Sequence, residues 1–219
     1  MSTKSLRFDE LPRTIPVFPL TGVLLLPRGR LPLNIFEPRY LRMLEDARRG
    51  AGLIGMIQPA KADTDMQDAP ELYRVGCLGT ISEFAPAKEG RYRIALAGVC
   101  RFEIVEEMPR GKLYREMLVS YAPYRADFEL ASGGFDRKRL GRAMEGFFKL
   151  SNLKVDWSAV AKAPDDALVS ALAMMCPFAP PEKQALLEAA SLGERAEIVT
   201  TLMEMALASR QASTQFTRQ

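Results

Sequence analysis

Histidine is absent from the sequence, so the chain lacks the residue that most enzymes use as a general base near neutral pH. Ser-His-Asp and Cys-His catalysis and histidine-ligated metals are thereby excluded. Catalysis by a Ser-Lys dyad or by a pair of carboxylates is not excluded by the absence of histidine. The only Gly-Lys pair, Gly111-Lys112, lacks the earlier glycine of a phosphate-binding loop and precedes Leu113. We therefore expect neither ATP hydrolysis nor any other enzyme activity, and no cofactor.

Acidic side chains gather in residues 60–71, a polar stretch that contains Asp63, Asp65, Asp68 and Glu71. Carboxylates at this spacing could suggest a calcium loop. The stretch lacks the central glycine and the twelfth-position glutamate of an EF-hand loop. The sequence therefore favours a solvated loop without a metal.

The three cysteines, Cys77, Cys100 and Cys176, are widely spaced and odd in number. This is typical of free, buried thiols in a reducing cytoplasm, although Cys77 and Cys100 are expected in adjacent strands. No run of about 18 apolar residues could span a membrane, and the N-terminus lacks the apolar core of a signal peptide. We expect a cytoplasmic protein that does not enter a membrane.

The elements that must position these side chains begin with a region divided by proline and glycine. Three short apolar runs at 17–20, 23–26 and 31–36 are interrupted by prolines, which strands tolerate only at edges, ends or bulges. We expect three short strands held by a larger sheet, followed by a helix of about ten residues that starts at Pro38.

Further strands are predicted at 53–57, 73–84, 91–105 and 113–121, with a hairpin turn at 85–90. Glycines inside the two long strands indicate bulges or the sharp coiling of a small closed barrel.

The apolar period becomes helical after residue 135. Asp136, Asp156 and either Asp165 or Asp166 are placed to cap three helices. Pro180-Pro181 starts a fourth helix, and the capping-box spacing of Ser191 and Glu194 opens a fifth. The eleven methionines could form an adaptable binding surface, but most fall on apolar helix faces and are interpreted as core residues. Trp157 is expected to anchor the same core.

These patterns predict an α+β fold in two lobes. A β-barrel lobe with one helix occupies residues 14–122, and a helical lobe occupies residues 136–209. A flexible arm at 1–13, a linker loop at 123–135 and a polar tail at 210–219 complete the chain.

Three groups of residues, in order and at the right spacing, resemble the Lon protease N-terminal (substrate-binding) domain. The opening group is PVFPL at 16–20, LP at 26–27, PL at 32–33 and FEPRY at 36–40. The second runs from Val75-Gly76 to Ile81 and from Gly98-Val99 to Arg101-Phe102, and the third is KQALLE at 183–188 with Arg195. The resemblance covers residues 14–208 and is closest to stand-alone bacterial members, because no ATPase or protease module follows.

The resemblance implies a PUA-like β barrel followed by an α-helical bundle. It also implies a non-catalytic module that recognises exposed or unfolded polypeptide segments, acting as an adaptor, a holdase or a regulator of proteolysis. The expected partners are such segments, with a protease or chaperone as a second partner.

Phe36, Glu37, Arg39 and Tyr40 are the most site-like cluster. One interpretation is structural: Glu37 and Pro38 begin a helix, and the carboxylate complements its dipole. The other is that these four residues rim a peptide-binding groove between the lobes, and we predict them as peptide-binding residues.

Basic side chains along the same helix offer an alternative function. PUA-like barrels in other proteins bind RNA, and the basic residues here are Arg28, Arg30, Arg39, Arg42, Arg48 and Arg49. Glu45 and Asp46 interleave with them, and the net charge is only +3. A solvated helix face is favoured, with RNA binding kept as the alternative.

Overall fold

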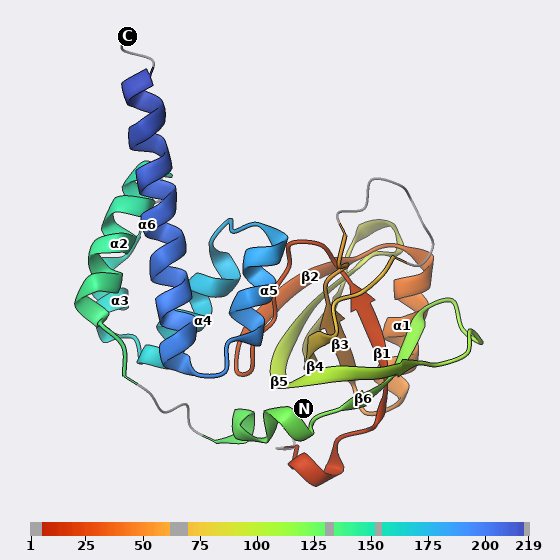
Figure 1. Cartoon of the computed structure of the whole chain (residues 1–219). Coiled ribbons are helices and arrows are strands. Elements are labelled where there is room, and N and C mark those ends of the chain that lie inside the picture. The colour runs from red at the N-terminus through yellow and green to blue at the C-terminus, as the bar shows by residue number, and fades with distance from the viewer. Residues whose placement is uncertain (1–5, 62–69, 130–133, 152–154, 217–219) are drawn as a thin grey trace.

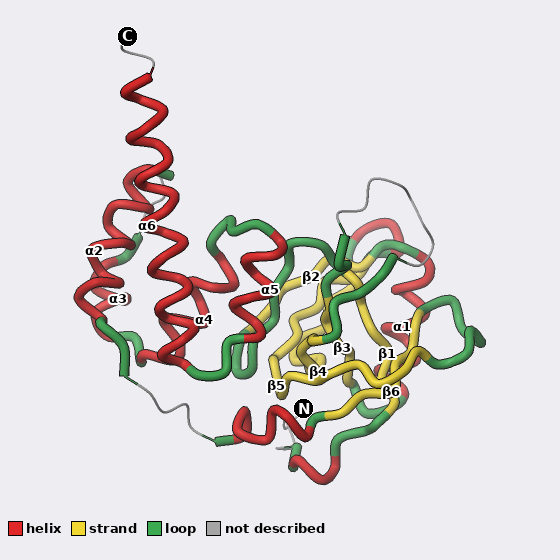
Figure 2. Tube along the Cα trace, viewed as in Figure 1, coloured by secondary structure: helices red, strands yellow, loops and turns green. Residues whose placement is uncertain are grey.

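The computed structural model describes residues 6–61, 70–129, 134–151 and 155–216. Figure 1 shows two lobes side by side, with the strands and α1 in one and helices α2 to α6 in the other. Figure 2 shows the same separation by type of secondary structure. The α+β class and the barrel followed by helices are confirmed.

Six strands form the first lobe. They are β1 (Thr14–Pro19), β2 (Arg30–Ile35), β3 (Leu53–Ile57), β4 (Val75–Pro86), β5 (Tyr92–Glu107) and β6 (Arg115–Ser120). Their order is β2-β5-β4-β3-β1-β6, and β5 also pairs with β6, which closes the sheet into a barrel. β1 and β3 run parallel, and the connection between them contains β2 and helix α1 (Pro38–Arg49).

The long strand β5 makes the closure possible, because its first half pairs with β2 and β4 and its second half pairs with β4 and β6. Register shifts at Leu78/Gly79 and Ile81/Glu83 mark the bulges that the glycine pattern predicts. A Cβ on Gly76 would lie 2.4 Å from the Phe102 ring, so the strands coil around that buried aromatic side chain.

Two clusters of buried apolar side chains hold the fold. One fills the barrel and includes Ile15, Leu78, Phe102 and Met117. The other starts under α1 on the barrel and continues into the helical lobe as far as Met203. The lobes therefore share one continuous core.

The second lobe contains α2 (Arg137–Leu150), α3 (Trp157–Lys162), α4 (Asp165–Met175), α5 (Pro180–Glu188) and α6 (Leu192–Phe216). Asp136 and Asp156 cap α2 and α3 as predicted, since their carboxylates accept backbone N–H bonds from the first turn of each helix. At α6, the Ser191 hydroxyl accepts from the Glu194 N–H, and the Glu194 carboxylate accepts from the Ala190 N–H. None of the described helices is long and apolar enough to span a membrane.

Several sequence-based expectations differ from the structure. Residues 23–26 are not a strand: Leu24, Leu25 and Leu26 are buried in an irregular connection between β1 and β2. Neither Asp165 nor Asp166 caps α4, because both lie inside its first turn, after Pro164. Trp157 is 43% exposed and is not a core anchor.

Helices occupy parts of the segments predicted as an arm, a linker and a tail. Residues 8–10 form the short helix η1 (Phe8–Glu10), and the Phe8 ring packs edge-on against Phe128. The expected linker contains the 3-10 helix η3 (Ala122–Phe128), and α6 extends to Phe216, into the expected tail.

Candidate functional site: a groove between the two lobes

A groove of about 440 Å³ lies where the barrel meets the helical lobe. Its walls come from five segments far apart in the sequence: the turn at 27–30, Arg101 of β5, η3 with Glu129, helix α4 and the start of α6. The groove thus depends on the docking of the two lobes.

The turn that forms one wall has an unusual residue at its third position. The Gly29 N–H donates to the Leu26 carbonyl at 2.9 Å, and Arg28 between them has φ of 63°. Glycine normally occupies this position in a type II turn, because a side chain at positive φ is strained. The turn is fixed on β5, where the Arg28 N–H donates to the Gly98 carbonyl and the Gly98 N–H donates to the Gly29 carbonyl, each at 2.8 Å.

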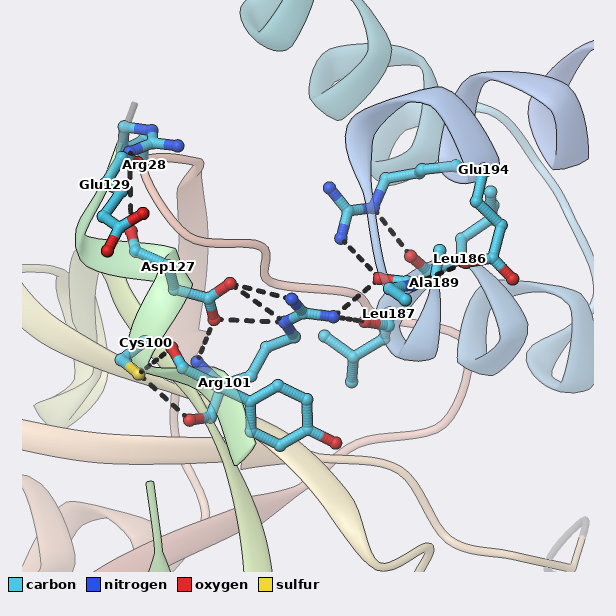
Figure 3. Close-up of polar contacts among 12 residues, drawn as sticks. Arg28, Cys100, Arg101, Asp127, Glu129, Leu186, Leu187, Ala189 and Glu194 are labelled. Carbon is cyan, nitrogen blue, oxygen red and sulfur yellow. Dashed lines mark hydrogen bonds and ion pairs between the residues drawn. The ribbon is translucent and has the colours of Figure 1, made fainter. Parts of the chain in front are cut away.

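The Arg28 side chain crosses from the barrel to two other walls of the groove. Its Nη1 donates to the carbonyl oxygen of Glu129 at 2.8 Å, as Figure 3 shows, and its Nε lies 3.7 Å from the Asp166 carboxylate on α4. These contacts explain how an arginine is held in a strained backbone conformation.

Arg101 and Asp127 form a buried ion pair at the base of the groove (Figure 3). Nε and Nη2 of Arg101 donate to both carboxylate oxygens at 2.8–3.2 Å, and the Arg101 backbone N–H donates to the same carboxylate at 2.9 Å. Burial is the largest single influence on the pKa of Arg101 and lowers it, but the hydrogen bonds to Asp127, the negative charge of that carboxylate and smaller contributions from Tyr124 and Cys77 together raise the pKa above its ordinary value. The guanidinium stays charged and also lies over the Tyr124 ring at 4.6 Å.

The C-terminal end of α5 receives two guanidinium groups. Arg101 Nη1 donates to the carbonyls of Leu187 and Ala189 at 3.1 and 2.7 Å, while Arg195 donates to Leu186 and, at 3.5 Å, to Ala189. Cations at a helix C-terminus complement its dipole. Burial, and then the nearby charge of Arg101, lowers the pKa of Arg195 to about 10.

Polar side chains of α5 also bond to barrel backbone. Gln184 donates to the Val75 carbonyl at 3.1 Å and accepts from Gln58, which in turn accepts from the Gly22 N–H. Lys183 Nζ donates to the carbonyls of Gly22 and Met174 at 2.9 and 3.3 Å, and burial lowers its pKa. These bonds fix the position of α5 on the barrel, so the groove is preformed.

The wall formed by α4 is mainly apolar, with Asp166 and Ser170 as its polar residues. Ala167 and Ala171 line it, Met174 contacts Gly29 across the lobe boundary, and Met175 is 83% exposed at its rim. The sequence favoured the interpretation that the methionines are core residues. This is confirmed for Met203, which is buried, and is wrong for Met175. An exposed thioether on a groove is an adaptable contact for apolar side chains.

The four residues predicted to bind peptide lie at the start of α1, outside the residues that line the groove. Glu37 and Arg39 form an ion pair with each other, and Tyr40 is buried against Phe18 with ring centroids 4.2 Å apart. Phe36 is 58% exposed. Glu37 is the residue before the helix, as the structural interpretation proposed, but its carboxylate makes no capping hydrogen bond.

Most of the basic residues on and near α1 have carboxylate partners. Arg42 and Arg49 pair with Asp46, Arg30 pairs with Glu83, and Arg48 lies over the Phe84 ring. Among the described residues, no group of three or more His, Cys, Asp or Glu side chains could hold a metal ion. The question of calcium at Asp63, Asp65 and Asp68 lies outside the described residues.

Comparison with known proteins identifies the family. The family model for the ATP-dependent protease La (LON) substrate-binding domain matches residues 14–205. The chain belongs to this Lon substrate-binding domain family. Lon protease of Azorhizobium caulinodans is 29% identical over 88% of this chain, and Lon protease 2 of Myxococcus xanthus is 26% identical over 89%. The chain spans about a quarter of the length of each, 22% and 24% respectively.

Solved structures share the fold. The Lon N-terminal domain protein from Xanthomonas campestris is 22% identical, with a TM-score of 0.57, over 84% of this chain and 95% of that one. The N-terminal domain of a Mycobacterium avium complex Lon protease is 14% identical, with a TM-score of 0.60, over 87% of this chain and 98% of that one.

Residues of the second and third groups that carry the family resemblance meet at the junction of the lobes. Lys183 and Gln184 of the third group bond to barrel backbone, and Arg101 of the second group and Arg195 of the third donate to the C-terminal end of the same helix. Sequence reasoning named these residues only as a signature. An arginine within the apolar run VCRFEIV was a signal that Arg101 needed a buried partner.

Proposed function

We propose that this chain is a non-catalytic polypeptide-recognition module that binds extended, unfolded segments in the groove between its lobes. The observation that carries the proposal is a preformed groove with a mainly apolar α4 wall and an exposed Met175, in a chain of the Lon substrate-binding family. Apolar contacts that tolerate different side chains suit a site that must accept many unfolded sequences.

The free edge of β2 supplies a path for the rest of the segment. Among the described strands, β2 pairs only with β5, and Pro32 and Asn34 on it are exposed. The strand leads from Arg30 at the groove to Phe36, so a peptide added along β2 would extend for about 20 Å, at roughly 3.3 Å per residue, toward Phe36, Glu37, Arg39 and Tyr40. The predicted peptide-binding residues become the far end of one extended site.

The test compares binding of one protein in two states. Reduced, carbamidomethylated α-lactalbumin, which cannot refold, is titrated against the chain, with folded α-lactalbumin as the control. We expect only the unfolded form to bind. Met175→Glu on the groove should weaken binding about tenfold, because a charge would replace an apolar contact.

Met205→Glu is the matched control, because Met205 is also exposed, at 59%, but does not line the groove. It should change the affinity less than about twofold. Equal losses in the two variants, or no binding of unfolded protein by the unmodified chain, would contradict the proposal.

The cellular role that we propose is delivery or protection of unfolded proteins, as an adaptor, a holdase or a regulator of proteolysis. A pull-down from native lysate with mass spectrometry separates these roles. Enrichment of a protease supports the adaptor or regulator, and enrichment of unfolded clients alone supports the holdase. Enrichment of RNA instead would support RNA binding, the alternative that the basic residues near α1 suggest.

A further inference from the structure

The base of the groove contains more positive than negative charge. Arg101 and Arg195 are both buried, at 6% and 9% exposure, and both donate to the Ala189 carbonyl. Asp127 is the only carboxylate among the described residues that bonds to either guanidinium, and it bonds to Arg101. Two buried cations are thus compensated by one anion and by the partial charges of the α5 carbonyls.

Arg195 is the uncompensated member of this pair. Within the described part of the chain its guanidinium donates to carbonyl oxygens, whereas a buried guanidinium is best stabilised by a carboxylate that accepts two parallel N–H bonds. Its lowered pKa has the same origin, since burial and Arg101 both disfavour the charged form. A negative group brought into the groove would offset this cost.

Arg28 brings a third guanidinium to the same groove from the opposite wall. Its side chain is 43% exposed, and its long 3.7 Å contact with Asp166 leaves it able to bind another anion. Arginine is the residue best suited to planar recognition of a carboxylate.

We propose that the groove binds a carboxylate of the polypeptide ligand between Arg28 and Arg195. The carboxylate belongs to an aspartate or glutamate side chain or to the C-terminus of the ligand, and the apolar wall of α4 contacts its neighbouring side chains. The inference rests on the proposed function and adds to it a preference for acidic segments.

Two carboxylates of the chain limit this preference. Glu129 and Asp166 also line the groove, so a ligand with several adjacent acidic residues would be repelled as its charge accumulates. We therefore expect the groove to prefer an isolated carboxylate that is flanked by apolar residues.

The first experiment uses matched peptides. Overlapping 15-residue peptides of α-lactalbumin are screened, and each binding peptide is resynthesised with its acidic side chains as amides or with its C-terminus as an amide. Fluorescence anisotropy should show about tenfold weaker binding for one of the two changes, because a charge-assisted hydrogen bond is lost. The change that weakens binding identifies the source of the carboxylate.

Variants of the chain locate the site. Arg28→Gln should reduce the roughly tenfold difference in affinity between the acidic peptide and its amide version to less than about twofold, because the guanidinium is lost. Gln keeps the same backbone strain at this position. Arg49→Gln is the control, because it removes the same charge from an exposed residue outside the groove. Arg195→Lys keeps the positive charge but loses the planar guanidinium. This variant should still bind the acidic peptide more tightly than the amide version, but by a smaller factor.

Glu129→Gln gives an independent readout, because it leaves both arginines in place and should strengthen binding of the acidic peptide several-fold. Equal binding of acid and amide peptides, together with no effect of Arg28→Gln, would overturn the inference while leaving polypeptide recognition intact. Failure of every peptide and of unfolded α-lactalbumin to bind would instead overturn the proposed function on which the inference rests.

Discussion

Arg101 joins three parts of the molecule through one side chain. From β5 it reaches the Asp127 carboxylate of η3 and the last carbonyls of α5, and it covers the Tyr124 ring. A lysine could not make these contacts together, because its ammonium group lacks the planar fork of donors. The residue therefore sets the geometry of the groove as well as contributing to stability.

We predict that Asp127→Asn lowers the free energy of unfolding by about 3 kcal/mol, because removing one partner of a buried ion pair leaves the other charge uncompensated. Urea denaturation measures the change. Glu107→Gln is the control, since the Glu107–Arg115 pair has similarly short bonds but a more exposed carboxylate and should cost at most about 1 kcal/mol. Similar losses in both variants would show that burial of the Arg101 pair has no special effect.

The backbone conformation and the contact partners of individual residues were the hardest features to predict from the sequence. The sequence showed that Arg28 is one of a group of basic residues, but it did not predict the positive φ of Arg28. That conformation depends on contacts with Gly98 and Glu129, which are distant along the chain. Arg101 and Arg195 were visible only as members of a family signature. Their partners come from η3 and α5, and no local pattern brings these segments together.

At the scale of elements, local chemistry predicted most of the structure. Strand β3 has the predicted bounds, and Asp136 and Asp156 cap their helices. The strand predicted at residues 23–26 was wrong. Three buried leucines there satisfy the apolar pattern of a strand, although the chain runs irregularly against a neighbouring strand. Apolar periodicity reports burial and does not distinguish a strand from a buried loop.

The turn at 26–29 gives the prediction that belongs to this scale. A Cβ on Gly98 would lie 2.0 Å from the Leu26 carbonyl oxygen, so Gly98→Ala must push this turn away from β5. We expect a loss of about 2–3 kcal/mol in the free energy of unfolding.

The same change should weaken binding of unfolded α-lactalbumin, because the turn carries Arg28 and Gly29 into the groove. Gly111→Ala is the control, since a Cβ added there would meet nothing within 4 Å and the φ of Gly111 is not positive. A Gly98→Ala variant with unchanged stability and binding would mean that the turn does not hold the groove in shape.

The whole molecule consists of a barrel lobe followed by a helical lobe, the architecture that the change in apolar periodicity predicts. The sequence placed a linker between them, whereas the structure places η3 there, with Asp127 bonded to the barrel strand β5. The four residues predicted to bind peptide lie at the opposite end of β2 from the groove, because β2 runs from Arg30 at the groove to Ile35, just before α1. Contacts between lobes depend on this long-range arrangement and leave no periodic signal in the sequence.

The shared core predicts that the lobes unfold together. Buried side chains form one cluster from the barrel to α6, and Arg101, Gln58 and Gln184 bond across the boundary, so opening one lobe would expose apolar and polar groups of the other. The three buried free thiols report on both lobes, because Cys77 and Cys100 lie in the barrel and Cys176 follows α4.

Pulsed thiol labelling at increasing urea concentration, with each site quantified by mass spectrometry, should give the same midpoint for all three cysteines. Labelling of Cys176 at lower urea than Cys77 and Cys100 would show that the helical lobe opens independently. Gln184→Ala tests the cause, because it removes the bonds to Gln58 and Val75 and leaves both apolar cores in place. The variant should lower all three midpoints together if the lobes are one cooperative unit, and a groove built from both lobes would then exist only while that unit stays folded.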